Sequence, residues 1–203
     1  MLEHKILVVG QLGTNCHLLW NPTTNAGVIV DPGDEADYIA TEIKKAGFTP
    51  QAILLTHAHV DHIGGVPALA TQYHIPVWMH NADRGLYLSP DNCLPPWIPA
   101  VQNLPLPAEA LPHIDGVDFT VIHTPGHTPG GVCYHFANDG FILSGETLFC
   151  GSIGRTDFPG GNYDTLIRSI REKLLLLPGE TIVYPGHGER TSIAIEKFSP
   201  YFE

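Results

Sequence analysis

Hydrophobic residues along this chain recur with two periods, one typical of β-strands and one typical of α-helices. Short runs rich in β-branched and aromatic residues, separated by Gly, Asn, Pro and Thr, predict strands. Their ranges are 4–9, 16–20, 26–31, 51–56, 75–80, 118–123, 131–136, 140–145 and 181–185. Apolar residues three or four apart predict helices at 34–47, 64–73, 163–177 and 191–198. Two groups of strands with interspersed helices favour an α/β architecture of sheet packed on sheet, with the helices outside.

Local signals set the expected boundaries. Asp34 is placed to cap the first helix, Gly47 to end it, and Pro67 falls in the first turn of the second helix, where a missing N–H costs nothing. Residues 89–112 are rich in proline and show no period. A segment of that length within a compact domain is typical of a lid or binding loop, or of a rigid, proline-stiffened loop.

Length and charge limit the class of protein. The 203 residues, 43% of them hydrophobic, predict one globular domain over 1–203. The formal net charge of −11 disfavours nucleic-acid and anionic-membrane partners. No apolar run has the length of a membrane span, and the start "MLEHKILVVG" reads as a strand, so we expect a cytoplasmic protein. The four cysteines form no CxxC pair and are expected to be reduced.

Four ligand-type residues follow the strand predicted at 51–56, in "THAHVDHIGG". His57 and His59 are two apart in an extended segment and therefore point the same way, toward one metal ion. Asp61 and His62 are adjacent, so the turn into the helix expected near Gly64 directs them to a second position. Imidazole and carboxylate groups suit Zn²⁺ or Fe²⁺, with Mn²⁺ also open.

Three further strands end in the same kind of residue. His127 follows the strand at 118–123, Glu146 follows 140–145, and His187 follows 181–185. Strand ends at one rim of a sheet present side chains to a shared cleft. His127 and His187 would each complete a triad, and Glu146 would bridge two ions about 3.5–4 Å apart. The other seven histidines are interpreted as ordinary surface or core residues.

These motifs resemble the metallo-β-lactamase superfamily, whose HxHxDH motif corresponds to His57 through His62. The resemblance covers nearly the whole chain and implies a four-layer αββα sandwich with the site at one edge of the sheets. Within the superfamily, "TPGHTPGG", "GSIGRTDFPGG" and "YPGHGERTSI" are similar to the glyoxalase II group, the hydroxyacylglutathione hydrolases. By that similarity His57, His59 and His127 would hold the first metal ion, and Asp61, His62 and His187 the second.

The chain departs from that pattern at two places. The bridging position, normally Asp, is Glu146, whose extra methylene extends the carboxylate by about 1.5 Å, against a tolerance of a few tenths of an ångström. We therefore expect two metal positions, one of them weaker, with a single ion as the alternative. Only sixteen residues follow His187, so we expect a short form without the C-terminal helical extension of long glyoxalase II enzymes. Arg155 would contact a glutathione carboxylate, or else pair with Asp157.

The resemblance implies hydrolysis of S-lactoylglutathione or a related hydroxyacyl thioester, with Asp61 orienting a metal-bound hydroxide. A thiolate leaves without obligatory protonation, which suits a sequence with no evident separate acid. Three alternatives remain: a mononuclear iron persulfide dioxygenase, which shares "GRTDF", a β-lactamase-like hydrolase, and a catalytically silent metal-binding protein. The oligomeric state cannot be read from these residues.

Overall fold

The computed structural model describes residues 1–202, and the chain folds into two compact units. The first runs from Met1 to Asp118 and the second begins at Phe119. Each unit contains one five-stranded sheet with helices packed on it, and the second also contains a two-stranded ribbon. Within residues 1–202 no helix has both the length and the apolar character needed to cross a bilayer.

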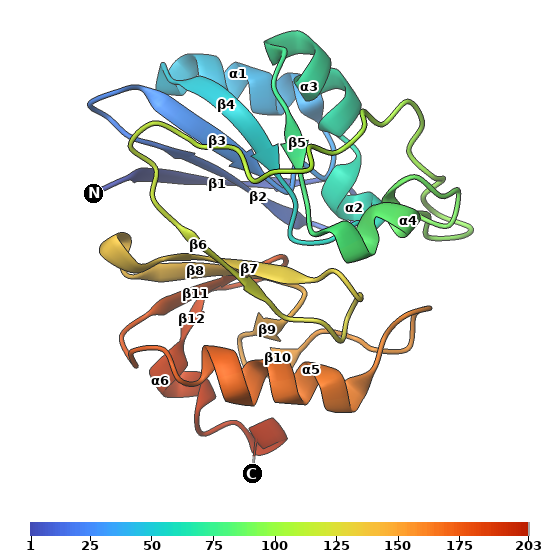
Figure 1. Cartoon of the computed structure of the whole chain (residues 1–203), viewed down its shortest axis with the longest axis vertical. Helices are drawn as coiled ribbons and strands as arrows, with labels where there is room; N and C mark the ends of the chain where they lie inside the picture. Colours follow the sequence, from blue (N-terminus) through green and yellow to red (C-terminus); the bar gives the residue numbers. More distant parts are fainter. Residues whose placement is uncertain (203) are drawn as a thin grey trace. The chain divides into compact units, whose positions relative to one another are not determined.

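The sheet of the first unit combines a meander with two parallel strands (Figure 1). Its strands, in spatial order, are β1 (Glu3–Val9), β2 (Thr14–Trp20), β3 (Ala26–Val30), β4 (Thr49–Leu54) and β5 (Val77–Trp78). The first three pair antiparallel, and β3, β4 and β5 run parallel. Parallel neighbours end at the same edge, so the chain leaves β3, β4 and β5 at one rim of this sheet.

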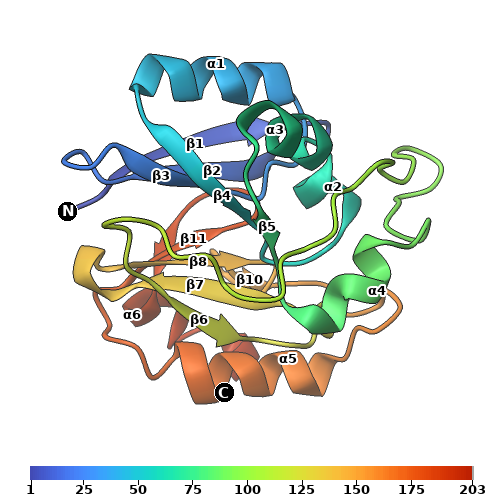
Figure 2. The ribbon, with the colours of Figure 1, turned by 45° about the horizontal axis from the view of Figure 1, so that its top comes forward.

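Two helices, α1 (Ala36–Ala46) and α3 (Val66–Tyr73), cover one face of this sheet (Figure 2). Ile39 and Ile43 of α1 and Leu69 of α3 are fully or almost fully buried in the cluster formed with the strands. Burying each such side chain contributes about 1.5–3 kcal/mol. These contacts hold the sheet rigid behind the strand ends that carry the ligand-type residues.

The ends of α1 confirm one expected cap and correct the other. Gly47 adopts a left-handed conformation, φ 77°, and its N–H bonds the Ile43 carbonyl, as predicted. The predicted N-cap, Asp34, is wrong, because the capping position is Glu35, also left-handed. The Asp34 carboxylate instead accepts a hydrogen bond of 2.7 Å from the Glu35 N–H, an alternative that short polar side chains often take.

Short helices and the proline-rich segment complete the first unit. The short helices are α2 (Val60–Ile63), the 3-10 turn η1 (Asn81–Asp83) and α4 (Arg84–Tyr87). The segment 89–112 contains only an isolated bridge between Leu94 and Ile98. Buried Asn92 anchors it, donating to the Tyr87 carbonyl at 2.8 Å and accepting from Val101 N at 3.0 Å.

The main sheet of the second unit has the order β12, β11, β8, β7, β6. The bounds are β6 (Thr120–His123), β7 (Val132–Phe136), β8 (Phe141–Gly145), β11 (Ile182–Pro185) and β12 (Thr191–Ser192). A separate ribbon pairs β9 (Leu148–Phe149) with β10 (Ser152–Ile153). Strands β8 and β11 run parallel, so Glu146 and His187 follow strands that end at one edge.

Helix α5 (Tyr163–Ser169) covers a face of this second sheet (Figure 1). A π-helical turn, η3 (Ile170–Leu174), continues it, and the two bury Leu166, Ile170 and Leu174. The helix predicted over 163–177 therefore ends three residues early. The helix predicted at 191–198 is shorter, α6 (Ile193–Glu196), because Thr191 and Ser192 pair with β11 as β12. A 3-10 turn, η4 (Pro200–Phe202), ends the described chain.

The thiols have no disulfide within the described residues. Cys16 and Cys133 are buried, Cys93 is half-buried and Cys150 is exposed, and all four are free, as predicted. Burial raises the pKa of the Cys133 thiol to about 11, so this side chain stays protonated at neutral pH.

Candidate metal centre

The first group of ligand-type residues extends from the end of β4 into α2. His57 is buried in the extended segment after β4, and His59 is the extended residue at the N-cap of α2. Asp61 and His62 lie inside α2, a short helix that the sequence did not predict, whereas the helix expected over 64–73 is α3, which begins at Val66. The ring centroids of His57 lie 4.8 Å from His59 and 4.2 Å from His62. The first unit therefore gathers all four residues of the motif.

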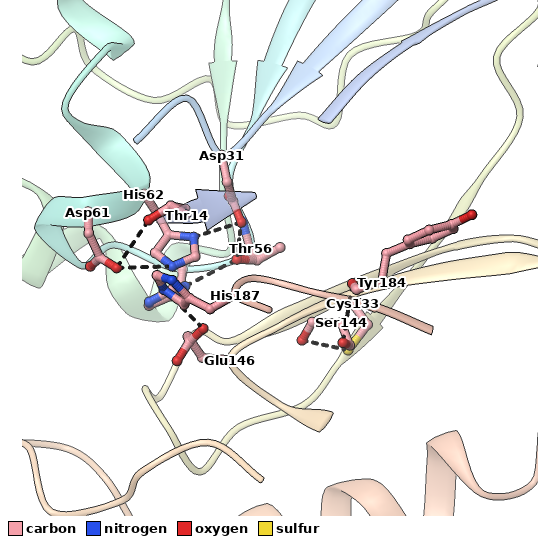
Figure 3. Close-up of polar contacts among 11 residues, drawn as sticks. Thr14, Asp31, Thr56, Asp61, His62, Cys133, Ser144, Glu146, Tyr184 and His187 are labelled. Atoms are coloured by element: carbon pink, nitrogen blue, oxygen red, sulfur yellow. Dashed lines mark hydrogen bonds and ion pairs between the residues drawn. The ribbon is translucent and has the colours of Figure 1, made fainter. Parts of the chain in front are cut away.

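Asp31, at the end of β3, has a buried carboxylate that contacts His62 directly and His57 through Thr56 (Figure 3). Its oxygens accept hydrogen bonds from Thr56 N at 2.8 Å, from Thr56 Oγ1 at 2.6 Å and from His62 Nδ1 at 2.9 Å. All three donors surround a residue that is 1% exposed. Hydrogen bonds to a charged acceptor in such a setting are about twice as strong as neutral ones.

These contacts determine which ring nitrogen carries the proton. A carboxylate only accepts, so His62 donates from Nδ1 to Asp31. Thr56 gives its single hydroxyl proton to Asp31, so its oxygen accepts at 3.1 Å from the Nδ1–H of His57. Both rings thus hold the proton on Nδ1 and keep the Nε2 lone pair for a metal ion, the arrangement found at histidine ligands supported by neighbouring oxygens.

Asp61 and its loop are held by close backbone packing. Its Oδ2 lies 3.5 Å from His62 Nε2 and 3.4 Å from the Thr14 hydroxyl, which donates to it. A Cβ on Gly33 would lie 1.8 Å from the Asp61 carbonyl oxygen, and one on Gly64 would lie 2.1 Å from the Gly33 carbonyl oxygen. Only glycine permits this approach, so "DPG" and "IGG" together position the ligand-bearing turn.

His127 is held in the second unit by a loop after β6. Its Nδ1 lies 2.7 Å from the Arg155 carbonyl oxygen, which only accepts, so Nδ1 is the donor and Nε2 keeps its lone pair. Gly126 has φ 136°, and a Cβ there would lie 2.4 Å from the backbone of Leu166. Two close backbone approaches therefore determine the direction of the imidazole.

Glu146 and His187 lie together at the ends of β8 and β11 (Figure 3). Glu146 Oε1 is 3.6 Å from His187 Nε2, and both side chains are mostly buried, 14% and 24% exposed. The N–H of Gly186 bonds the Gly145 carbonyl at 2.9 Å, which ties the two strand ends together. The expectation that these strand ends meet at one rim is confirmed within the second unit.

Arg155 is engaged by its own loop. Its Nε and Nη2 donate to the two carboxylate oxygens of Asp157, each at 2.7 Å, and its guanidinium lies 3.9 Å from the centroid of the Phe158 ring. These hydrogen bonds hold the pKa of Asp157 at about 2. The pairing with Asp157 is the second of the two expectations for Arg155. Its guanidinium remains half-exposed, with a side-chain accessibility of 54%.

The donors gathered in the first unit fit a divalent metal ion. In the first unit the ligand atoms of His57 and His59 lie within 4.8 Å of each other, as do those of Asp61 and His62. Three imidazoles, in His57, His62 and His127, direct Nε2 away from the oxygen that holds Nδ1. Neutral imidazoles oriented in this way, with adjacent carboxylates, bind Zn²⁺ or Fe²⁺ well.

The supporting residues were missed by reasoning from sequence. Asp31, Thr56 and Thr14 contact ligand-type residues, yet none of them was assigned a role from the sequence, although Thr56 opens the "THAHVDHIGG" stretch. A signal was present for Asp31, because it follows the buried strand "AGVIV" just as His57 follows "QAILLT". The rule that strand ends meet at one rim applies equally to both.

Two sheets with covering helices and oriented imidazoles at strand ends define a metal-binding protein of mixed α/β fold. Residues 9–187 match the family described as Metallo-beta-lactamase superfamily, and the chain belongs to that superfamily. The expected fold, with its two sheets and mixed α/β content, is confirmed.

Two curated relatives align with this chain over almost its full length and theirs. The chain is 38% identical over 202 residues to "Probable metallo-hydrolase YqgX" of Bacillus subtilis, covering 97% of this chain and 95% of the relative. It is 38% identical over 207 residues to "Hydroxyacylglutathione hydrolase GloC" of Haemophilus influenzae, covering 98% and 96%. The protein is therefore a metallo-hydrolase of this superfamily.

Three solved structures are similar to this chain in both fold and sequence. BLEG-1 B3 metallo-beta-lactamase matches with a TM-score of 0.89 and 38% identity, covering 98% of this chain and 99% of that chain. TTHA1623 in a di-iron-bound form matches with a TM-score of 0.86 and 37% identity, covering 97% and 99%. ETHE1 from Myxococcus xanthus matches with a TM-score of 0.78 and 28% identity, covering 97% and 82%. The second of these neighbours is in a di-iron-bound form, so membership of this fold does not by itself select zinc.

Proposed function

We propose that this protein hydrolyses the thioester of S-lactoylglutathione or a related hydroxyacyl thioester. The observation that carries the proposal is the 38% identity, over 98% of the chain, to a relative named as a hydroxyacylglutathione hydrolase. Water and the thioester would give a hydroxy acid and a free thiol. The supporting geometry is the set of oriented imidazoles and carboxylates in each unit.

The metal ligands in this proposal come from both units. His57, His59 and His127 would hold one ion, and Asp61, His62 and His187 the other. Support comes from the family match, which runs from residue 9 to residue 187 and so includes all six residues. Zinc is the proposed metal, with iron or manganese as alternatives. When bound, the ions supply Lewis acidity and an acidified water molecule.

Glu146 would serve the ion beside His187, because its Oε1 lies 3.6 Å from that imidazole. Its longer side chain, compared with the usual Asp, would make this second ion the weaker of the two or leave a single ion.

Residues of the chain itself would orient the attacking water molecule and accept its proton. Asp61 Oδ2 receives the Thr14 hydroxyl hydrogen bond, which leaves Oδ1 to orient the attacking water and accept its proton. Asp31 and Thr56 would hold the imidazoles of His62 and His57 in the tautomer with a lone pair on Nε2. The thiolate product needs no proton donor, because its conjugate acid has a pKa near 8.5.

Metal quantification and an activity assay on the same sample test the proposal. We expect about two equivalents of metal and turnover of S-lactoylglutathione that disappears on chelation and returns with metal. A fully metallated sample without thioesterase activity would contradict the proposal. Oxygen uptake with glutathione persulfide would instead indicate the dioxygenase alternative.

A second candidate is β-lactam hydrolysis, favoured by the 38% identity to a chain named as a B3 metallo-beta-lactamase. Turnover of nitrocefin by the metallated protein, at a rate above that with the thioester, would support this activity over the first.

We also propose that the two units act as one domain over 1–203, since the family match crosses the boundary between them. A cytoplasmic location is proposed because the four free thiols suit a reducing compartment. Neither a membrane nor a nucleic acid is proposed as a partner, given the net charge of −11.

A further inference from the structure

A pocket of about 420 Å³ lies in the first unit, outside the residues assigned to metal binding. Its walls come from the end of β5, the start of α4 and the segment 107–109. Lining side chains include Trp78, His80, Arg84 and Glu109. The pocket therefore combines an aromatic wall with groups of both charges.

One wall of the pocket, Trp78, belongs to the strand beside the one that leads to the metal ligands. Strands β4 and β5 run parallel with Leu54 opposite Trp78, and Leu55 N donates to the Trp78 carbonyl at 2.9 Å. Two residues beyond Leu55 is His57. Neighbouring strands lie about 4.8 Å apart, so Trp78, a wall of the pocket, stands one strand spacing from the strand that carries the ligand motif. On the other side of β5, Ala108 N donates to the Val77 carbonyl at 2.8 Å and fixes the outer wall.

The charged side chains of the pocket, Arg84 and Glu109, have no ion-pair partner in the described part of the protein. Within residues 1–202, neither the Arg84 guanidinium nor the Glu109 carboxylate forms an ion pair. Arg168 and Arg190 likewise form no ion pair within these residues, but of the three only Arg84 lines the pocket. Arg155 contrasts with it, since both carboxylate oxygens of Asp157 already occupy that guanidinium.

A guanidinium and a carboxylate facing one small cavity match a ligand that carries both charges. An α-amino acid group has a carboxylate for bidentate hydrogen bonds from arginine and an ammonium group for a carboxylate. The Trp78 ring offers an apolar surface for the methylenes attached to such a group. A simple anion would use Arg84 and leave Glu109 opposed to it.

We propose that this pocket binds the α-amino-carboxylate end of the γ-glutamyl group of a glutathione-linked substrate. The inference rests on the proposed function, because it supplies the recognition of the carrier for that thioester. Arg84 binds the carboxylate, Glu109 binds the ammonium group, and Trp78 contacts the side-chain methylenes.

Binding of S-methylglutathione to the full-length, metal-loaded protein tests the pocket, because this thioether cannot be hydrolysed. By calorimetry we expect Arg84→Met and Glu109→Gln each to weaken binding about tenfold, the loss expected for one charge-assisted contact. S-methylcysteinylglycine, which lacks the γ-glutamyl group, should bind weakly and equally to all variants. Matched controls are Arg168→Met and Glu172→Gln, the same changes at positions of the second unit, which should bind as the wild type does.

The outcomes separate the pocket from the reaction. Binding of S-methylglutathione that depends on Arg84 and Glu109, in a protein without thioesterase activity, supports the pocket and overturns the proposed function. Thioesterase activity with wild-type binding in both variants overturns the pocket alone. Absence of S-methylglutathione binding to the wild-type protein also overturns the pocket. Circular dichroism confirms folding, and the Glu109 variant tests the pocket if the Arg84 variant does not fold.

Discussion

Asp31→Asn changes the group that holds His62 while leaving shape and backbone almost untouched. Asp31 has φ 50°, a left-handed conformation that Asn adopts readily, so the substitution adds no backbone strain. The two side chains have nearly the same volume, so no cavity forms. What changes is the hydrogen bonding, because one of two acceptor oxygens becomes an NH₂ group.

The structure gives Asp31 three donors and no acceptor, so the new amide cannot satisfy them all. The donors are Thr56 N at 2.8 Å, Thr56 Oγ1 at 2.6 Å and His62 Nδ1 at 2.9 Å. Leaving one buried donor unsatisfied costs about 1–3 kcal/mol of folding stability. If the amide NH₂ faces His62, the imidazole relieves the clash by moving its proton to Nε2, the nitrogen proposed to bind metal. Losing such a supporting group lowers metal affinity about 10–100-fold.

Competition with a chromophoric chelator measures the affinity for each equivalent of zinc, and urea unfolding of the metal-free protein measures stability. We expect the weaker equivalent to be lost first in Asp31→Asn. The matched control is Asp83→Asn, since Asp83 is equally buried at 1% exposure but stands before α4, outside the ligand motif. The control should lose stability without a change in zinc affinity. Unchanged zinc affinity in Asp31→Asn, with stability reduced, would refute the assignment of the tautomer to Asp31.

Three other predictions concern the loops and the pH dependence. Gly33→Ala places a Cβ 1.8 Å from the Asp61 carbonyl oxygen, so urea unfolding should show a loss of about 1–3 kcal/mol, whereas Gly85→Ala, with nothing within 4 Å, should be neutral or stabilising. Glu146→Asp should retain the second metal ion better after mild chelation, measured by elemental analysis; equal tight occupancy in both proteins would contradict this. Burial lowers the pKa of His4 to about 4, so between pH 6.5 and 4 only the unfolded chain takes up its proton. As pH drops through this window, the free energy of unfolding of the wild type should therefore fall by about 3 kcal/mol more than that of His4→Asn. Urea unfolding at several pH values measures this difference. Parallel pH profiles for the two proteins would argue against His4 as the source of the pH dependence.

The sequence by itself determined the family, the positions of most strands along the chain and the ligand-type residues. His57, His59, Asp61 and His62 stand in one local motif, where spacing alone predicts two directions of approach. The sequence also predicted that Gly47 ends one helix and that Pro67 lies in the first turn of another, because the effects of glycine and proline on the backbone are local. Boundaries were less readable: Ser192 was expected in a helix but pairs with Ile182 of β11, and a local pattern does not reveal a partner on another strand.

Only the tertiary structure decided which groups support the ligands. Asp31 is 31 residues from His62 in the chain, and their contact exists because β3 and β4 are parallel neighbours that end at one rim. Arg155 could have been free or paired, and the fold of its loop places Asp157 against it. Likewise, the Arg84 and Glu109 pocket arises because segment 107–109 returns along β5. The sequence specifies which chemical groups the side chains carry. Their hydrogen-bond partners and ion pairs depend on distances between groups, and only the packing of the folded chain determines those distances.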